Sequence, residues 1–177
     1  MLPHTGWLSF FYDIEHVTDA IPDGGRVLYV PGEQANLTRT PAPETLNGWN
    51  QFGCCTVTFS SMIMLPSPDS ERLEDVLSDR SVMSDEWSMY EDLRHQLRML
   101  SGPQQSGVYL LGYPDESWIM EPDLTWTHLF QIDCNAAEWQ GAEQMGWADG
   151  LILHFWIPLE KLARCDFSQI RVFPNIS

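Results

Sequence analysis

The segment at residues 150–157 constrains the fold more than any other part of the chain. Gly150 is followed by seven residues, six of them apolar, and β-branched and aromatic types are frequent among them. Pro158 then ends the run. This composition is typical of a strand that is buried on most of its surface. We therefore expect residues 151–157 to form the centre of a sheet.

A second strand is predicted just upstream, at residues 126–133. Polar Thr127, His128 and Gln131 are interleaved there with apolar residues, which is the pattern of a half-buried strand. A long polar loop, residues 134–149, separates the two predicted strands. An antiparallel pair is the simplest way to connect them.

The start of the chain repeats part of this pattern. Residues 6–12 match residues 150–156: a glycine, two large apolar residues, a variable pair and two aromatic residues. In each copy an arginine then begins a short strand. Arg26 lies 20 residues after Gly6, and Arg171 lies 21 residues after Gly150. Two explanations stay open. The chain contains an internal duplication, or the copies converge because strands favour the same residue types.

The most clearly predicted helix covers about residues 85–101. Ser84 is a favourable N-cap, acidic residues follow it in the first turn, and Gly102–Pro103 ends the segment. The apolar residues form one stripe, namely Tyr90, Leu93, Leu97 and Leu100. We predict an α+β fold in a single domain over residues 1–177. Its mainly antiparallel, twisted sheet forms two pseudo-symmetric halves, with this one main helix packed on it.

Two shorter elements are expected between the halves. Residues 54–65 contain a period-two alternation that predicts a half-exposed strand. Ser70 is a suitable cap for a short helix, with Glu71 near its N-terminus.

Charge is the strongest compositional feature. The chain has 25 acidic and 9 basic residues, a net charge of −16, and no lysine or arginine lies between Arg98 and Lys161. A field of this sign repels nucleic acids and anionic membranes, and it attracts cationic partners or metal ions. The alternative is that the acidity serves solubility alone. Nucleic-acid binding is excluded on either reading.

Several features predict a cytoplasmic protein. The sequence has no stretch approaching 18 consecutive apolar residues and no secretory leader pattern. Its four cysteines are too few and too irregular for a disulfide framework, so we expect reduced thiols.

The sequence carries no catalytic signature. Its five histidines stand in no zinc-ligand spacing, and there is neither a nucleophile elbow nor a glycine-rich phosphate loop. His128 and His154 are expected to be neighbours across the sheet, and Asp133 and Asp149 to approach at the strand ends. We predict a protein that is not an enzyme, with no catalytic residue, metal ligand or cofactor.

Partner binding is better supported by two loops, residues 113–126 and 134–149, which combine acids with tryptophans and methionines. Exposed aromatic rings act as interface anchors, and surrounding charge steers the partner. The other possibility is that the rings fold back onto the sheet. The predicted partner-binding residues are Asp115, Glu116, Trp118, Glu121, Asp123, Glu138, Trp139, Glu143 and Asp149.

Several short motifs occur in an order that resembles the YwqG-like bacterial family. They are Gly6–Asp13, Leu110–Asp115, Leu129–Asp133, Gly146–Gly150, Leu153–Ile157 and Asp166–Ser168. Members of that family usually have more chain before the first motif, including a strand that would pair with the first copy here. The resemblance brings no catalytic residues. Some members are described as immunity proteins encoded beside bacterial toxins. The resemblance implies the same role here.

Together these observations predict an immunity protein that neutralises a cognate cationic toxin. A nuclease effector is favoured because its substrate groove is already positive. The acidic loops would either occupy that groove or bind beside it. The alternative function is a metal- or small-ligand-binding domain, hydrolytic or not, that uses His128 and His154.

Overall fold

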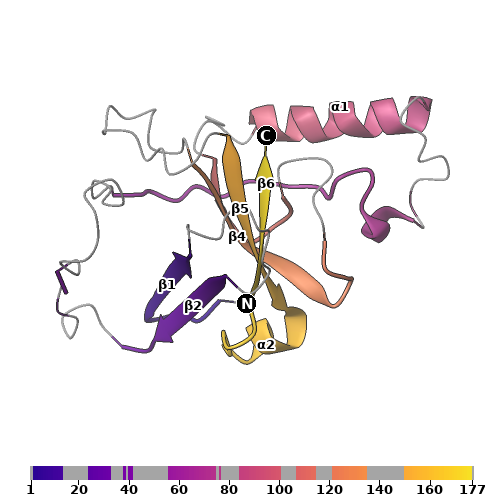
Figure 1. Cartoon of the computed structure of the whole chain (residues 1–177). Helices are drawn as coiled ribbons and strands as arrows, with labels where there is room; N and C mark the ends of the chain where they lie inside the picture. The colour runs from indigo at the N-terminus through magenta and orange to yellow at the C-terminus, as the bar shows by residue number, and fades with distance from the viewer. Residues whose placement is uncertain are drawn as a thin grey trace.

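The computed structural model describes residues 2–13, 24–32, 38, 40–41, 56–74, 76, 84–100, 107–114, 121–134 and 150–176. The elements are β1 (Trp7–Tyr12), β2 (Gly25–Val30), the 3-10 helix η4 (Glu71–Leu73), α1 (Asp85–Leu100), β3 (Val108–Leu110), β4 (Trp126–Asp133), β5 (Leu151–Pro158), α2 (Leu159–Ala163) and β6 (Arg171–Ile176) (Figure 1). The strands form a two-stranded sheet, β1-β2, and a four-stranded sheet, β3-β4-β5-β6, in which all neighbours are antiparallel. The predicted α+β fold is confirmed.

The centre of the larger sheet is the pair β4–β5, as predicted. Every residue of β5 is buried. The register shifts within β4, where His128 pairs with Trp156 and Phe130 with Phe155, so Leu129 is an extra residue in the ladder. Such a β-bulge changes which residues of the strand share a face.

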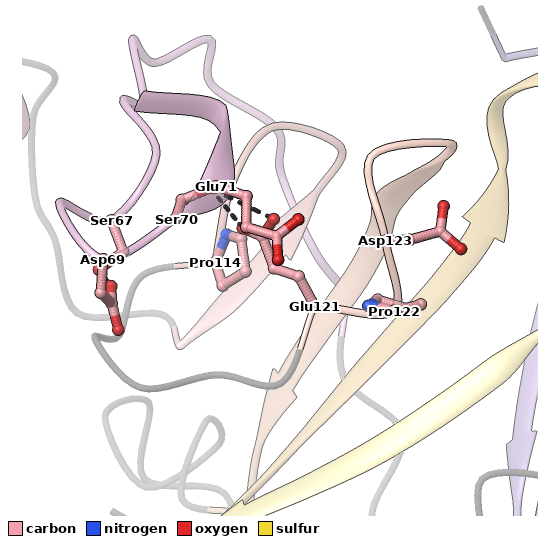
Figure 2. Close-up of a pocket in the computed structure, with 8 residues that line it drawn as sticks. All are labelled: Ser67, Asp69, Ser70, Glu71, Pro114, Glu121, Pro122 and Asp123. Atoms are coloured by element: carbon pink, nitrogen blue, oxygen red, sulfur yellow. Dashed lines mark hydrogen bonds between the residues drawn. The ribbon is translucent and has the colours of Figure 1, made fainter. Parts of the chain in front are cut away.

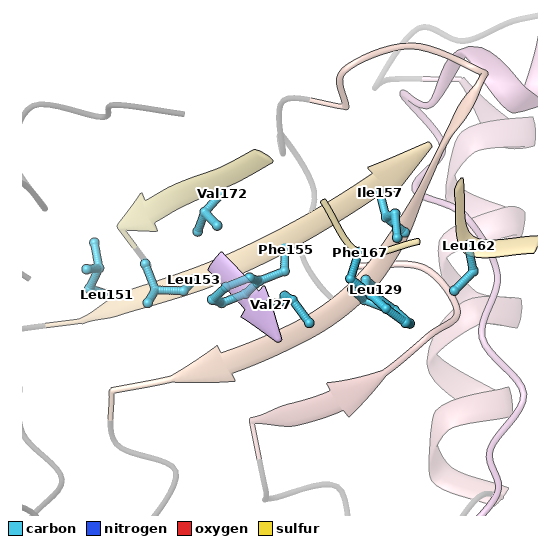
Figure 3. Packing of buried hydrophobic residues seen from close by; sticks show 9 residues of the cluster. All are labelled: Val27, Leu129, Leu151, Leu153, Phe155, Ile157, Leu162, Phe167 and Val172. Atoms are coloured by element: carbon cyan, nitrogen blue, oxygen red, sulfur yellow. The ribbon is translucent and has the colours of Figure 1, made fainter. Parts of the chain in front are cut away.

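One face of the larger sheet carries the hydrophobic core. The buried members of this cluster are Val27, Leu129, Leu151, Leu153, Phe155, Ile157, Leu162, Phe167 and Val172 (Figure 3). The β1–β2 sheet covers this face. Phe10 stacks on Phe130 with ring centroids 4.2 Å apart and meets Phe155 edge-on at 5.4 Å. At Gly25 the two sheets are so close that a Cβ atom would overlap Val172 Cγ2.

The two similar sequence copies both form antiparallel pairs, β1–β2 and β5–β6. Their registers differ by one residue. Arg26 pairs with Phe11, whereas Arg171 pairs with Trp156, which corresponds to Tyr12 in the first copy. This difference follows from the extra residue between glycine and arginine in the second copy. In the described residues, only the second pair is extended by further strands, β3 and β4.

Helix α1 has the predicted bounds to within one residue and the predicted cap, because Ser84 Oγ accepts a hydrogen bond of 3.1 Å from the Trp87 N–H. Its buried side differs in part from the predicted stripe. Trp87 and Arg94 are buried, whereas Leu93 is 46% and Leu100 83% exposed. The predicted stripe is therefore wrong for Leu93 and Leu100, whereas its other two members, Tyr90 and Leu97, are half-buried. The large Trp87 ring is buried in place of the two exposed leucines, and Glu91 neutralises Arg94 through an ion pair of 2.8 Å.

Two further predictions can be compared with the structure. Ser70 caps η4 by accepting a hydrogen bond from the Arg72 N–H, as expected. Residues 56–65 form no strand with any part of the chain that the structure describes, so the predicted strand at 54–65 is wrong over these residues. The segment instead leads to Pro66, whose carbonyl accepts a hydrogen bond of 3.0 Å from the Tyr90 hydroxyl of α1. No described helix is long and apolar enough to cross a membrane.

Candidate functional site

A pocket of about 230 Å³ lies where residues 67–71 meet the segment that leads into β4 (Figure 2). Its lining residues are Ser67, Asp69, Ser70, Glu71, Pro114, Glu121, Pro122 and Asp123. Four of the eight are carboxylates and none is basic. We call this site the acidic pocket.

Glu121 is held in place by hydrogen bonds and an ion pair. The Ser70 hydroxyl lies 3.1 Å and 3.2 Å from the two carboxylate oxygens. Arg72 Nε lies 3.5 Å from Oε2, and Arg72 Nη2 donates to the Trp126 carbonyl at 2.6 Å. Because Trp126 begins β4, Arg72 joins the pocket to the central strand pair. Glu121 is therefore fixed in position, and Arg72 offsets part of its charge.

Asp123 lies in the turn that starts β4, where the Trp126 N–H donates to the Asp123 carbonyl at 3.1 Å. Its carboxylate accepts hydrogen bonds from the Thr125 hydroxyl and, at 2.7 Å, from the Thr125 N–H. These two bonds favour the charged form and lower the pKa of Asp123. Asp123 thus presents a fixed negative charge to solvent.

The remaining two carboxylates come from the run Ser67–Glu71. The Ser67 hydroxyl donates to Asp69, and Glu71 is the first residue of η4. The sequence predicts only a helix start in this run and does not indicate that Asp69 and Glu71 belong to a site. The available indication is the run itself, since serine, proline and acidic residues together favour a turn.

The acidic pocket can accept a cationic group. Three or more carboxylates around one space create a negative potential, and a guanidinium or ammonium group would satisfy their acceptor oxygens. In the described part of the chain, no group of three or more His, Cys, Asp or Glu side chains is placed to hold a metal ion.

The structure brings together two of the predicted partner-binding residues, Glu121 and Asp123. The other predicted residues lie outside the described part of the chain: Asp115, Glu116, Trp118, Glu138, Trp139, Glu143 and Asp149. For these the sequence prediction stays a prediction. Asp133 ends β4 as expected, and its proposed neighbour Asp149 is also outside the described residues.

A second cluster lies on the face of the larger sheet opposite the core. His154 Nδ1 is 3.3 Å from His128 Nε2, both rings are buried, and Trp156 meets His128 edge-on with ring centroids 5.2 Å apart. Within the described residues, three buried nitrogens have no hydrogen-bond partner: His128 Nδ1, His154 Nε2 and Trp156 Nε1. We call this cluster the histidine pair.

Burial determines the protonation of the histidine pair. Desolvation, and then the proximity of His154, place the pKa of His128 well below its usual range. Burial lowers the pKa of His154 from 6.5 to about 4. Both rings are therefore neutral at pH 7.

A family model described as a domain of unknown function (DUF1963) matches residues 1–173. A search of curated proteins found no match.

Proposed function

The chain belongs to the DUF1963 family, and on that premise we propose that it is a YwqG-like immunity protein that binds and neutralises a cationic bacterial toxin in the cytoplasm. The observation that carries this proposal is the acidic pocket. Two residues selected from sequence as partner contacts, Glu121 and Asp123, line it together with two further carboxylates.

The charges of the pocket suit a basic partner. Asp123 is ionised and exposed, and Glu121 is held by Ser70 and Arg72 in one orientation. Preorganised acceptors lose less side-chain entropy on binding than mobile ones, so they contribute more to affinity. The net charge of −16 steers a cationic protein toward the surface from a distance.

A nuclease is the favoured class of toxin. Its active-site groove is positive because it binds phosphates, and carboxylates can take the place of those phosphates. The protein acts in this proposal by binding alone, without catalysis or cofactor.

Affinity purification from the native host tests the proposal. The tagged protein would be isolated at low and at high salt, and bound proteins identified by mass spectrometry. The test variant is Glu121→Gln with Asp123→Asn, which keeps side-chain shape and removes two negative charges. Lysine is unsuitable at position 121 because it would face Arg72. The matched control is Thr5→Lys with Ser9→Lys, two exposed positions at and before β1 that change the net charge equally.

We expect one basic protein to be recovered at low salt, with less at high salt because screening weakens charge contacts. The Glu121/Asp123 variant should lose about 90% of it or more, since two charge-assisted contacts contribute roughly 1.5–3 kcal/mol each. The Thr5/Ser9 control should retain it. Equal recovery with both variants would exclude the acidic pocket as the binding site. A preparation without any basic partner would contradict the immunity function itself.

The alternative function, metal or small-ligand binding, would use the histidine pair. Among the described residues, the contact between His128 and His154 and their unpartnered nitrogens favour this pair as the site for such a ligand. Elemental analysis of protein purified without chelators tests this alternative. A stoichiometric metal that is present in the parent protein and lost in the variant His154→Asn would support metal binding at the histidine pair.

A further inference from the structure

Helix α1 has two sides of different character. Trp87, Glu91, Arg94 and Arg98 recur at i, i+4, i+7 and i+11, and this side is buried or half-buried. Met89, Leu93, Gln96 and Leu100 recur at the same intervals on another side, and all four are exposed. Met89 is 72% exposed, in addition to the exposures of Leu93 and Leu100 given above. Apolar side chains at this spacing normally face a core or a partner.

The charges beside this exposed apolar side have one sign. Asp85, Glu86 and Asp92 are the exposed acidic residues of α1, whereas Arg94 and Arg98 belong to the other side. The exposed side therefore combines three apolar residues and one glutamine with an acidic margin. Methionine adds adaptability, because its flexible side chain packs against many shapes.

We propose that the side of α1 formed by Met89, Leu93, Gln96 and Leu100 is a docking surface for a basic amphipathic helix of another protein. The distance along the helix from Met89 to Leu100 is about 16 Å at 1.5 Å per residue, which corresponds to three turns of a partner helix. Apolar residues of that helix would pack against the three apolar residues, and its lysines or arginines would lie beside Asp85 and Asp92.

The charges favour a basic partner helix over a second copy of the chain. Two copies meeting through α1 would each bring a net charge of −16, and the exposed ionised residues on this side of both helices are acidic. Like charges across an interface oppose association. An anionic membrane is disfavoured for the same reason. The inference holds for any basic partner and does not require that the partner be a toxin.

Peptide binding to the full chain tests the proposal. The probe is a labelled peptide of about 14 residues made of leucine and lysine, with leucines at helical spacing. A scrambled peptide of the same composition controls for charge alone. Affinities would be measured by fluorescence anisotropy at about 0.15 M salt, where nonspecific attraction is screened.

The test variant is Met89→Gln with Leu93→Gln, because glutamine preserves helix propensity. The matched control is Phe11→Thr with Leu28→Thr, two residues that are each 53% exposed on the outer face of β1–β2. We expect the patterned peptide to bind at least about tenfold more weakly to the Met89/Leu93 variant, because two apolar contacts are lost. Its affinity for the Phe11/Leu28 control should stay within about twofold of the parent protein.

Three results would overturn the proposal. The scrambled peptide could bind as tightly as the patterned one, which would leave only charge attraction. The Met89/Leu93 variant could bind the patterned peptide as tightly as the parent protein. Sedimentation could show that the free protein is a dimer which the Met89/Leu93 substitutions dissociate, and the surface would then belong to a second copy.

Discussion

At the scale of single residues, one extra residue in β4 places Gln131 on the same face as the histidine pair. In a regular strand, residues 128 and 131 would point to opposite faces. The bulge at Leu129 turns both toward the same face, where His128 lies opposite Trp156 and Gln131 opposite His154. The sequence predicted that the histidines were neighbours because both lie on paired strands. It did not predict the bulge, because nothing in the local residue types marks it.

This arrangement predicts that stability falls in mildly acidic solution. Both histidines have a lowered pKa in the folded protein, so below pH 6.5 the unfolded chain binds more protons and unfolding becomes easier. The loss of folding stability that is due to His154 begins near pH 6.5 and is complete near pH 4. Between pH 7 and pH 5 we expect His154 to lower the free energy of unfolding by about 2 kcal/mol, and His128 to lower it further.

Urea unfolding at pH 7, 6 and 5 measures this decrease. The variant His128→Gln with His154→Asn removes the titrating groups and retains polar atoms at the contact. Its stability should depend less on pH than that of the parent protein over this interval. Identical pH dependence in the two proteins would contradict the assignment.

At the scale of elements, strands β1, β2, β4, β5 and β6 and the cap and ends of α1 followed from the sequence because local chemistry sets them, whereas the strand predicted at 54–65 did not form over residues 56–65. Ser84 and the run at 151–157 carry their preference in their own residues. The buried side of α1 did not follow. A helix with apolar residues on more than one side has several possible packing sides, and the neighbouring segment selects among them. Here Tyr90, a member of the predicted stripe, bonds to the Pro66 carbonyl, but the buried Trp87 ring lies outside that stripe and the packed side includes it in place of Leu93 and Leu100.

The side through which α1 packs has a measurable consequence for stability. Trp87→Ala should cost about 3 kcal/mol, because it empties a buried site. Leu93→Ala should cost less than about 0.5 kcal/mol, because its side chain is exposed and alanine favours a helix. Urea unfolding of the two variants compares them directly. A greater loss for Leu93→Ala would mean that α1 packs through the stripe expected from the sequence.

At the scale of the whole molecule, the acidic pocket illustrates what sequence reasoning missed. Glu121 and Asp123 stood out because they lie in a long interval without basic residues. Asp69 and Glu71 did not, because they are about 50 residues away along the chain and reach the pocket only through the fold. The ion pair from Arg72 to Glu121 is a contact between these distant segments.

The packing of the two sheets leads to a prediction at the same scale. Gly25→Ala should destabilise the protein by about 1–3 kcal/mol, because the new methyl group meets Val172. Val172→Ala removes the obstructing Cγ2 and leaves a cavity. In the double variant the alanine at position 25 fills part of that space. We expect a favourable coupling of about 1 kcal/mol in a double-mutant cycle of urea unfolding. Strict additivity would show that the sheets are further apart.

The contact between Gly25 and Val172 also relates to the order in which the chain is made. The hairpin β1–β2 is translated before the strands that it covers, and Val172 follows Gly25 by 147 residues. At about 5–20 residues per second this interval lasts on the order of 10 s. During this interval Phe10 lacks first Phe130 and then Phe155, and Gly25 lacks Val172, so the aromatic hairpin is not fully covered until β4, β5 and β6 have all been made.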